Sequence, residues 1–262
     1  SILGTEDGVA RLASRLVAYG MGDVTLYVGE NLSYENEKIF HAKAAELTEY
    51  RGDALSVLTA CNENAVPLPA VHGICDEEFL RGKAPMTKEE VRTVSLSKLR
   101  LQEDSVCYDV GAGTGSVSVE MALRAWKGQV YAIEKKEDAL ALLKENRRKF
   151  ATDNLEIVAG TAPEAMVELP VPTHAFIGGS SGNMNEIIRL LLDKNPKVRI
   201  VINCITLETV TEAMNAIRDF SLTDVDIVQL SAARSKSIGR YHMMMGENPI
   251  YIISCSGRGE EI

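Results

Sequence analysis

The chain has 262 residues, of which 45% are hydrophobic and 25% charged, the balance of an ordinary globular protein. No apolar run approaches the roughly 20 residues of a membrane-spanning helix, and no signal-peptide pattern opens the chain, so we expect no membrane partner. The net charge of −9 argues against a nucleic-acid partner. The five cysteines are scattered and form no C-x-x-C pair, which argues against disulfides or a metal site and favours a cytoplasmic location.

The first 66 residues predict a helix, a strand, a second helix and a second strand, at 8–19, 24–28, 35–47 and 55–60. Two prolines in Val66-Pro67-Leu68-Pro69 interrupt either kind of element, so we place a boundary there between domains 1–66 and 67–262. Because two strands make a poor independent sheet, we expect residues 1–66 to be a small partial α/β segment, the end of a domain whose first part is absent.

From about residue 85 the pattern is a regular alternation of strands and helices. Thr87 and Glu90 form a T-x-x-E capping box, which predicts that a helix begins at 88 and runs to 99. We expect strands at 106–110, 129–133, 155–158, 175–177, 199–203, 224–230 and 249–254, and further helices at 116–126, 136–150, 184–194 and 207–220. This alternation predicts an α/β, Rossmann-like, mostly parallel seven-stranded sheet whose last strand is antiparallel, because no helix separates the final two strands.

A glycine-rich turn follows the first of these strands. It reads Asp109-Val-Gly111-Ala112-Gly113-Thr114-Gly115, and its glycines let the backbone approach a ligand at the start of the next helix. The dinucleotide fingerprint G-x-G-x-x-G would need glycine where Ser116 stands. The pattern D-x-G-x-G-x-G is instead usual for S-adenosylmethionine-dependent methyltransferases. We expect Asp109 either to order the loop or to reach the ammonium group of that cofactor.

Two further turns complete the candidate cofactor site. Glu134 ends the second strand, where a carboxylate can accept both ribose hydroxyls of a nucleoside. Thr161 and Ala162 follow the third strand, where backbone amides can read the edge of the adenine. The same turn also fits a plain helix start, with Thr161 as the cap and Pro163 in the first helical position.

With these pieces placed, the chain resembles the precorrin-6Y C5,15-methyltransferases (decarboxylating) of cobalamin biosynthesis. The resemblance of residues 72–257 to the C-terminal module rests on these stretches: Asp76 to Phe79, Ala84 to Arg92, Asp109 to Gly115, Gly160 to Ala165, Gly178 to Gly182, and Leu207 to Thr209. Residues 1–66 resemble the end of a tetrapyrrole methylase domain through Val28 to Ser33. A site for methylation at carbon 5 would need both halves of that domain.

The resemblance implies an activity and a set of contacts. The activity is S-adenosylmethionine-dependent methylation of carbon 15 of a precorrin, with decarboxylation of the acetate on carbon 12, by a homotetramer. The implied cofactor contacts are Thr87, Gly111 to Gly115, Glu134 and Ala162. An electron-rich ring needs little base catalysis, so we name no catalytic acid or base.

The implied substrate is a polycarboxylate, which gives two basic stretches a purpose. Arg81, Arg234 and Arg240 are candidates to hold its carboxylates, although such stretches also occur as solvated faces. Gly179 and Ser180 would let a flat ring approach the methyl group, unless this turn is only flexible surface. Tyr241 and His242 are expected in a methionine-rich packing loop. A methyltransferase acting on protein or RNA, a nicotinamide dehydrogenase and a non-catalytic interaction subunit remain as alternatives.

Overall fold

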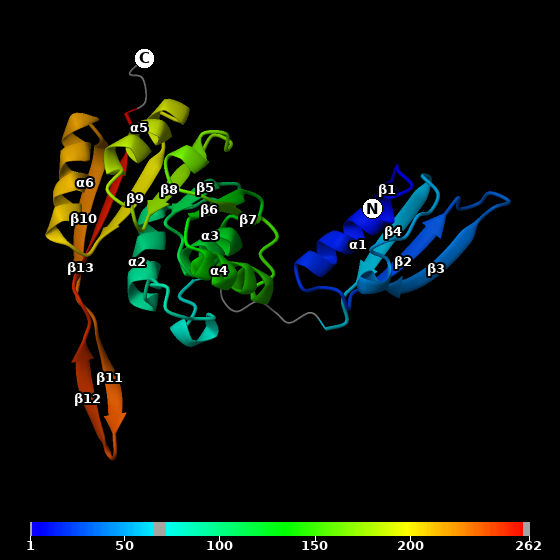
Figure 1. The fold of residues 1–262 in the computed structure, drawn as a ribbon, viewed down its shortest axis with the longest axis horizontal. Helices are drawn as coiled ribbons and strands as arrows, with labels where there is room; N and C mark the ends of the chain where they lie inside the picture. The colour runs from blue at the N-terminus through cyan, green and yellow to red at the C-terminus, as the bar shows by residue number, and fades with distance from the viewer. Residues whose placement is uncertain (1, 65–71, 259–262) are drawn as a thin grey trace. The chain divides into compact units, whose positions relative to one another are not determined.

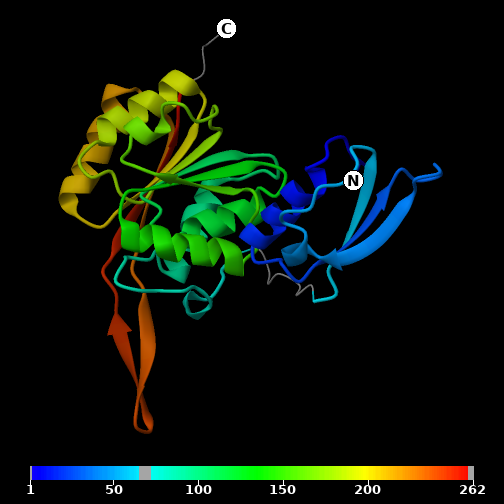
Figure 2. The same cartoon turned by 45° about the vertical axis from the view of Figure 1, so that its right-hand side comes forward.

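The computed structural model describes residues 2–64 and 72–258, which form a smaller unit before residue 68 and a larger unit after it (Figures 1 and 2). The boundary predicted at Val66 to Pro69 falls largely on residues 65–71, so it lies outside the described residues. Within the described ranges, no helix has the length and apolar character needed to cross a membrane.

The smaller unit is one helix against a four-stranded sheet. Helix α1 (Gly8–Ala18) packs on strands β1 (Ile2–Leu3), β2 (Thr25–Glu30), β3 (Lys38–Lys43) and β4 (Ser56–Cys61), which lie in the order β1-β4-β2-β3. Every pairing in this sheet is antiparallel. Its core contains Val9 and Ala13 from the helix, with Leu26, Val28 and Leu58 from the strands. The expected small segment of helix and strands is therefore present, and its strands pair antiparallel.

The helix predicted at 35–47 is also wrong. Residues 38–43 form β3 and only Ala44–Glu46 make a 3₁₀ turn, η1. Along β3 the half-buried residues are Phe40 and Ala42, whereas Ile39 and His41 are exposed, which is the two-residue period of a strand. Pairing with β2 decides the outcome, because Phe40 lies opposite Val28 and the His41 ring stacks on Tyr27 at 5.4 Å.

The larger unit is a seven-stranded sheet with helices on both faces (Figure 1). Its strands are β5 (Val106–Val110), β6 (Gln129–Glu134), β7 (Leu155–Ala159), β8 (His174–Ile177), β9 (Arg199–Cys204), β10 (Thr223–Leu230) and β13 (Ile250–Ser256). Its helices are α2 (Glu89–Leu99), α3 (Ser116–Arg124), α4 (Glu137–Lys149), α5 (Met184–Lys194) and α6 (Leu207–Asp219), with 3₁₀ turns η2 (Asp76–Glu78) and η3 (Glu164–Met166). All seven predicted strands and five predicted helices of this unit are present, most within one or two residues of their predicted bounds.

The strand order is β10-β13-β9-β8-β5-β6-β7. Neighbours are parallel except at β13, which runs antiparallel to both β9 and β10. The predicted Rossmann-like class with an antiparallel last strand is confirmed. The chain leaves β5 toward β6 on one side and returns to β8 on the other, so a topological switch point lies between β5 and β8.

Local details differ from the predictions in three places. The capping box at Thr87 is not formed, because Lys88 is the N-cap of α2 and makes no side-chain cap bond. Thr161 begins no α-helix, since only η3 follows with Pro163 as its N-cap. The predicted methionine-rich loop is a β-hairpin of β11 (Ala233–Ile238) and β12 (Tyr241–Gly246), a separate two-stranded ribbon (Figure 1).

Candidate cofactor and substrate site

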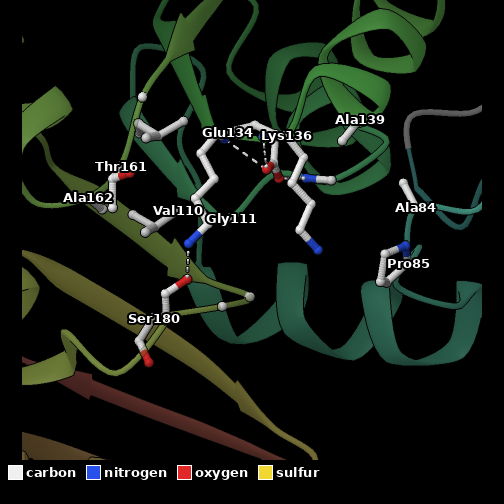
Figure 3. Close-up of a pocket in the computed structure, with 17 residues that line it drawn as sticks. Ala84, Pro85, Val110, Gly111, Glu134, Lys136, Ala139, Thr161, Ala162 and Ser180 are labelled. Atoms are coloured by element: carbon white, nitrogen blue, oxygen red, sulfur yellow. Dashed lines mark hydrogen bonds between the residues drawn. The ribbon is translucent and has the colours of Figure 1, made fainter.

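The loops after β5, β6, β7 and β8 enclose a cavity of about 200 Å³, which we call the inner cavity (Figure 3). Each loop contributes to its lining, through Gly111, Glu134, Ala162 and Gly179 respectively. Pro85, from the segment before α2, also lines it. The cavity therefore lies at the switch point of the sheet, outside the carboxyl ends of the parallel strands, where such sheets bind ligands.

The glycine-rich loop needs its glycines for packing as well as for backbone conformation. Gly111 has a φ of +77°, and a Cβ there would lie 2.9 Å from the carbonyl oxygen of Gly179. A Cβ on Gly113 would lie 2.8 Å from the carbonyl oxygen of Pro85. Because these contacts are with backbone atoms that cannot rotate away, the loops after β5 and β8 and the segment before α2 approach one another without side chains between them.

Asp109 is completely buried beneath this loop. Its Oδ2 accepts a hydrogen bond from the Ser118 hydroxyl, while its Oδ1 has no hydrogen-bond partner in the part of the chain that the structure describes. Burial raises the pKa of this carboxyl to about 7; the Ser118 hydrogen bond opposes the rise and the charge of Glu134 adds to it. Asp109 is not part of the inner cavity's lining, so its position favours ordering of the loop over direct contact with a ligand.

Glu134 joins the end of β6 to the glycine loop. Its Oε2 accepts from the amide of Gly113 at 2.9 Å, and its Oε1 accepts from the amides of Lys135 at 2.8 Å and Lys136 at 2.9 Å (Figure 3). The side chain is only 8% exposed and lines the inner cavity. Three backbone donors therefore hold one carboxylate in a fixed orientation at the wall of the cavity.

The opposite wall comes from the turns after β7 and β8. Thr161 and Ala162 line the cavity, and the Asn183 side chain fixes the carbonyl of Ala162 at 3.0 Å. Gly179 and Ser180 line it as well, so the structure brings these four predicted residues together with the glycine loop and Glu134. From the loop itself, Gly111 and Gly113 line this cavity, whereas Thr114 and Gly115 do not. The buried Thr114 hydroxyl has no hydrogen-bond partner among the described residues.

A second cavity of about 540 Å³, the outer cavity, adjoins the first and shares Pro85, Gly111 and Gly178 with it. Thr87 and Ala112 line this outer cavity rather than the inner one. Its lining also contains the apolar Met86, Val91, Ile205 and Ile250 and the polar or charged Lys88, Asn203, Glu247 and Asn248. The structure therefore places most, but not all, of the predicted cofactor residues around two adjoining cavities.

Thr87 is held by a buried ion-pair network. Nη1 of Arg92 donates to the Thr87 carbonyl at 2.7 Å, and Nε of Arg92 donates to Glu120 at 2.5 Å. The same guanidinium pairs with Asp76 at 3.3 Å and donates to the carbonyl of Ile74. Because Arg92 and Glu120 are fully buried, this network fixes the path of the segment that precedes α2.

The three predicted substrate arginines line neither cavity. Arg234, at the base of the hairpin, pairs with Glu90 at 2.8 Å and with Asp76 at 3.5 Å. Arg240 lies between β11 and β12 with its guanidinium on Tyr241, and Arg81 is exposed. The structure does not bring these residues together, and their contact with a substrate stays a prediction.

Three residues of the cavities went unnoticed in the sequence. Lys135 and Lys136 line the inner cavity, and Nζ of Lys135 donates to the Ser181 hydroxyl at 3.1 Å. Asn203 is the last residue but one of β9 and lines the outer cavity. Their positions in the sequence could have indicated them, because each lies close to the end of a strand, at the ligand-binding edge of the sheet. Among the described residues, no group of His, Cys, Asp and Glu side chains gathers where it could hold a metal ion.

Residues 78–256 match the family model described as a precorrin methyltransferase domain. The chain belongs to the precorrin methyltransferase family. This precorrin methyltransferase is similar to a probable cobalt-precorrin-6B C(15)-methyltransferase (decarboxylating) from Pyrobaculum calidifontis, with 44% identity over 71% of this chain and 96% of the relative. The cobalt-precorrin-6B C(15)-methyltransferase (decarboxylating) of Salmonella typhimurium is 41% identical over 69% of this chain and 94% of the relative.

A solved structure agrees with these relatives. The crystal structure of precorrin-6y C5,15-methyltransferase from Geobacter metallireducens has 39% sequence identity and a TM-score of 0.68, over 71% of this chain and 98% of that chain. As a member of this family, the chain is an S-adenosylmethionine-dependent methyltransferase.

Proposed function

We propose that this chain transfers the methyl group of S-adenosylmethionine to carbon 15 of a precorrin-type tetrapyrrole and releases the acetate carboxyl on carbon 12 as carbon dioxide. The names of the relatives from Pyrobaculum and Salmonella support this reaction. The observation that carries the proposal is the pair of adjoining cavities at the switch point, one walled by Glu134 and the glycine loop and the other by apolar and polar side chains together.

The inner cavity fits the nucleoside part of this cofactor. A carboxylate has about four lone-pair positions, and three of those on Glu134 accept backbone amides, so one remains for a ribose hydroxyl. Thr161 and Ala162 would face the adenine, and the loop Gly111 to Gly115 would face the amino-acid end, near Thr87. Asp109 would support that loop from beneath.

The outer cavity fits the acceptor ring. When bound, the cofactor supplies an electrophilic methyl group on a positively charged sulfonium. Because a conjugated ring carbon is already nucleophilic, the protein has mainly to position the ring and exclude water. Met86 and Val91 exclude water with apolar side chains, whereas Gly178 and Gly179 leave room for a flat ring beside the methyl group.

Binding of S-adenosylhomocysteine, measured by isothermal titration calorimetry, tests the cofactor site. We expect the wild type to bind, Glu134→Ala to weaken binding at least tenfold, and Asp109→Ala to abolish it. The matched control is Glu156→Ala, which removes an exposed carboxylate on the neighbouring β7 and should bind normally.

Turnover of a precorrin-6B, with or without cobalt, should give a product that has gained a methyl group and lost carbon dioxide. Methylation of protein or RNA instead would contradict the proposed function.

We also propose that the protein is a homotetramer whose copies contact one another through the β11–β12 hairpin. A lone two-stranded ribbon is marginally stable in water, and this one exposes Ile238, Tyr241 and Met243 to Met245. A second copy would cover this apolar surface. Light scattering should show smaller species for Met243→Ser/Met244→Ser/Met245→Ser, but not for Trp126→Ser, which changes an exposed aromatic side chain outside the hairpin. An unchanged mass for the triple variant would refute this interface.

Three further assignments are part of the proposal. Residues 1–66 correspond to the end of a tetrapyrrole methylase domain and 67–262 to the methyltransferase and decarboxylase domain. The protein works in the cytoplasm. Its substrate is the small tetrapyrrole, without a nucleic-acid or membrane partner.

A further inference from the structure

Asn203 is a buried polar residue beside the outer cavity, the proposed acceptor site. It lies at the end of β9, is 8% exposed, and lines both the outer cavity and a third cavity of about 340 Å³. The third cavity is formed by the turn after β8, which includes Ser180 and Ser181, and by the start of α6, which includes Thr206. Asn203 is therefore a polar side chain shared by two neighbouring cavities.

The amide of Asn203 is only half satisfied. Its Oδ1 lies 3.0 Å from the Ser95 hydroxyl on α2, whose single proton also points to the Val91 carbonyl at 2.8 Å. Its buried Nδ2 has no hydrogen-bond partner among the described residues. A buried unpartnered donor destabilises a folded protein and is uncommon in native structures. A ligand that brings an acceptor to Nδ2 would remove this penalty.

The described side chains that line the third cavity include no cation. The described residues that line it include no lysine, arginine or histidine, and the ionisable group among them is Glu212. The side-chain donors in its lining are neutral, namely the hydroxyls of Ser180, Ser181, Thr206 and Thr209 and the amide of Asn203. The nearby Lys135 ammonium is not in the lining and donates to the Ser181 hydroxyl. Such a cavity can orient a carboxylate by hydrogen bonds without stabilising its negative charge by a salt bridge. When a carboxylate leaves as carbon dioxide, the negative charge moves away from its oxygens. A cation beside it would stabilise the ground state more than the transition state, so neutral hydrogen-bond donors suit this step better.

We propose that the third cavity takes the acetate group that is lost, and that Asn203 contacts its carboxylate through Nδ2. This inference rests on the proposed function. Methylation takes an electron pair from the ring to form the new carbon–carbon bond. Decarboxylation breaks the bond between the acetate methylene and its carboxyl carbon, releases carbon dioxide and returns that electron pair to the ring. The methylene carbon then gains a proton from water as the ring gives one up.

The test measures methylation and decarboxylation separately, by mass spectrometry of the tetrapyrrole product. Asn203→Ala should slow carbon dioxide loss about 10- to 100-fold, the range for one lost hydrogen bond to a charged group, and a methylated product that keeps its carboxyl should accumulate. Asn203→Asp should also slow it, because an aspartate side chain cannot donate the hydrogen bond and would repel the acetate from the cavity, where Glu212 already lies. Both variants should bind S-adenosylhomocysteine with the wild-type dissociation constant.

The matched control is Ser254→Ala. Its hydroxyl is likewise buried and unpartnered, on β13, but it lines none of these cavities, so both rates should stay at the wild-type value. The inference is overturned if the Asn203 variants decarboxylate at the wild-type rate, if they lose both steps in the same proportion, or if they lose S-adenosylhomocysteine binding. A wild type that binds no S-adenosylhomocysteine and converts no precorrin would instead refute the proposed function itself.

Discussion

At the scale of single residues, the most informative group is the carboxyl of Asp109. Sequence reasoning selected it for the acidic position before a glycine loop, but could not distinguish a ligand contact from a structural support. The structure buries it completely, with one oxygen on Ser118 and the other unpartnered. Burial favours the neutral form, which is why the pKa of Asp109 rises from 3.8 to about 7.

This raised pKa predicts a specific dependence of stability on pH. Between pH 4 and 7 the folded state holds a proton on Asp109 that the unfolded state has released, so the free energy of unfolding should fall as pH rises through this range. Asp109→Asn keeps the shape of the side chain but cannot ionise, so its free energy of unfolding should depend less on pH. By pH 8 the wild type should have lost on the order of a few kcal/mol more of this free energy than the variant. Urea unfolding at several pH values measures this.

The control for that experiment is Glu145→Gln, an exposed carboxylate on α4 that should leave the pH dependence unchanged. Parallel curves for the wild type and Asp109→Asn would show that the carboxyl is charged in the folded protein throughout. They would also remove the argument that it supports the loop in its neutral form.

At the scale of elements, the segment before α2 is positioned by charge rather than by propensity. The predicted capping box at Thr87 is absent, and Arg92 holds the Thr87 carbonyl instead, with Glu120 and Asp76 as its counter-charges. Glu120 comes from α3 and also accepts the amides of Gly73 and Ile74. No local pattern reveals this arrangement, because its members are brought together only by the packing of α2 on α3.

Breaking this network should be costly. Arg92→Met leaves the buried Glu120 without its counter-charge, while Asp76 keeps its contacts with Arg234 and Lys88. We expect a loss of about 3–5 kcal/mol in the free energy of unfolding. Lys127→Ala removes the exposed pair with Glu103 and should cost less than about 1 kcal/mol. Urea denaturation compares the two. Equal effects would mean that the buried network does not hold the segment in place.

At the scale of the whole molecule, the larger unit was predictable and the smaller one only in part, since α1, β2 and β4 match predicted elements but β1 and β3 do not. The long alternation after residue 85 specifies parallel pairing, because each crossover helix carries the chain back to the same edge of the sheet. Within residues 2–64, β3 has the composition of a helix, and Ile2–Leu3 is too short to recognise. Both become strands by pairing with β2 and β4, which only the folded sheet provides. The β11–β12 hairpin was missed for the same reason, since its methionines suggested packing without revealing a strand.

The sequence by itself determined the Rossmann-like class, the glycine loop, the position of Glu134 and the family resemblance. These depend on local spacing and on the rule that parallel strands end at a common edge. Only the tertiary structure decided that Asp109 is buried, that the arginines of the hairpin lie away from the cavities, and that Asn203 links two of them. Those features depend on contacts between residues far apart in the chain, whose distances and burial exist only once the sheet is assembled.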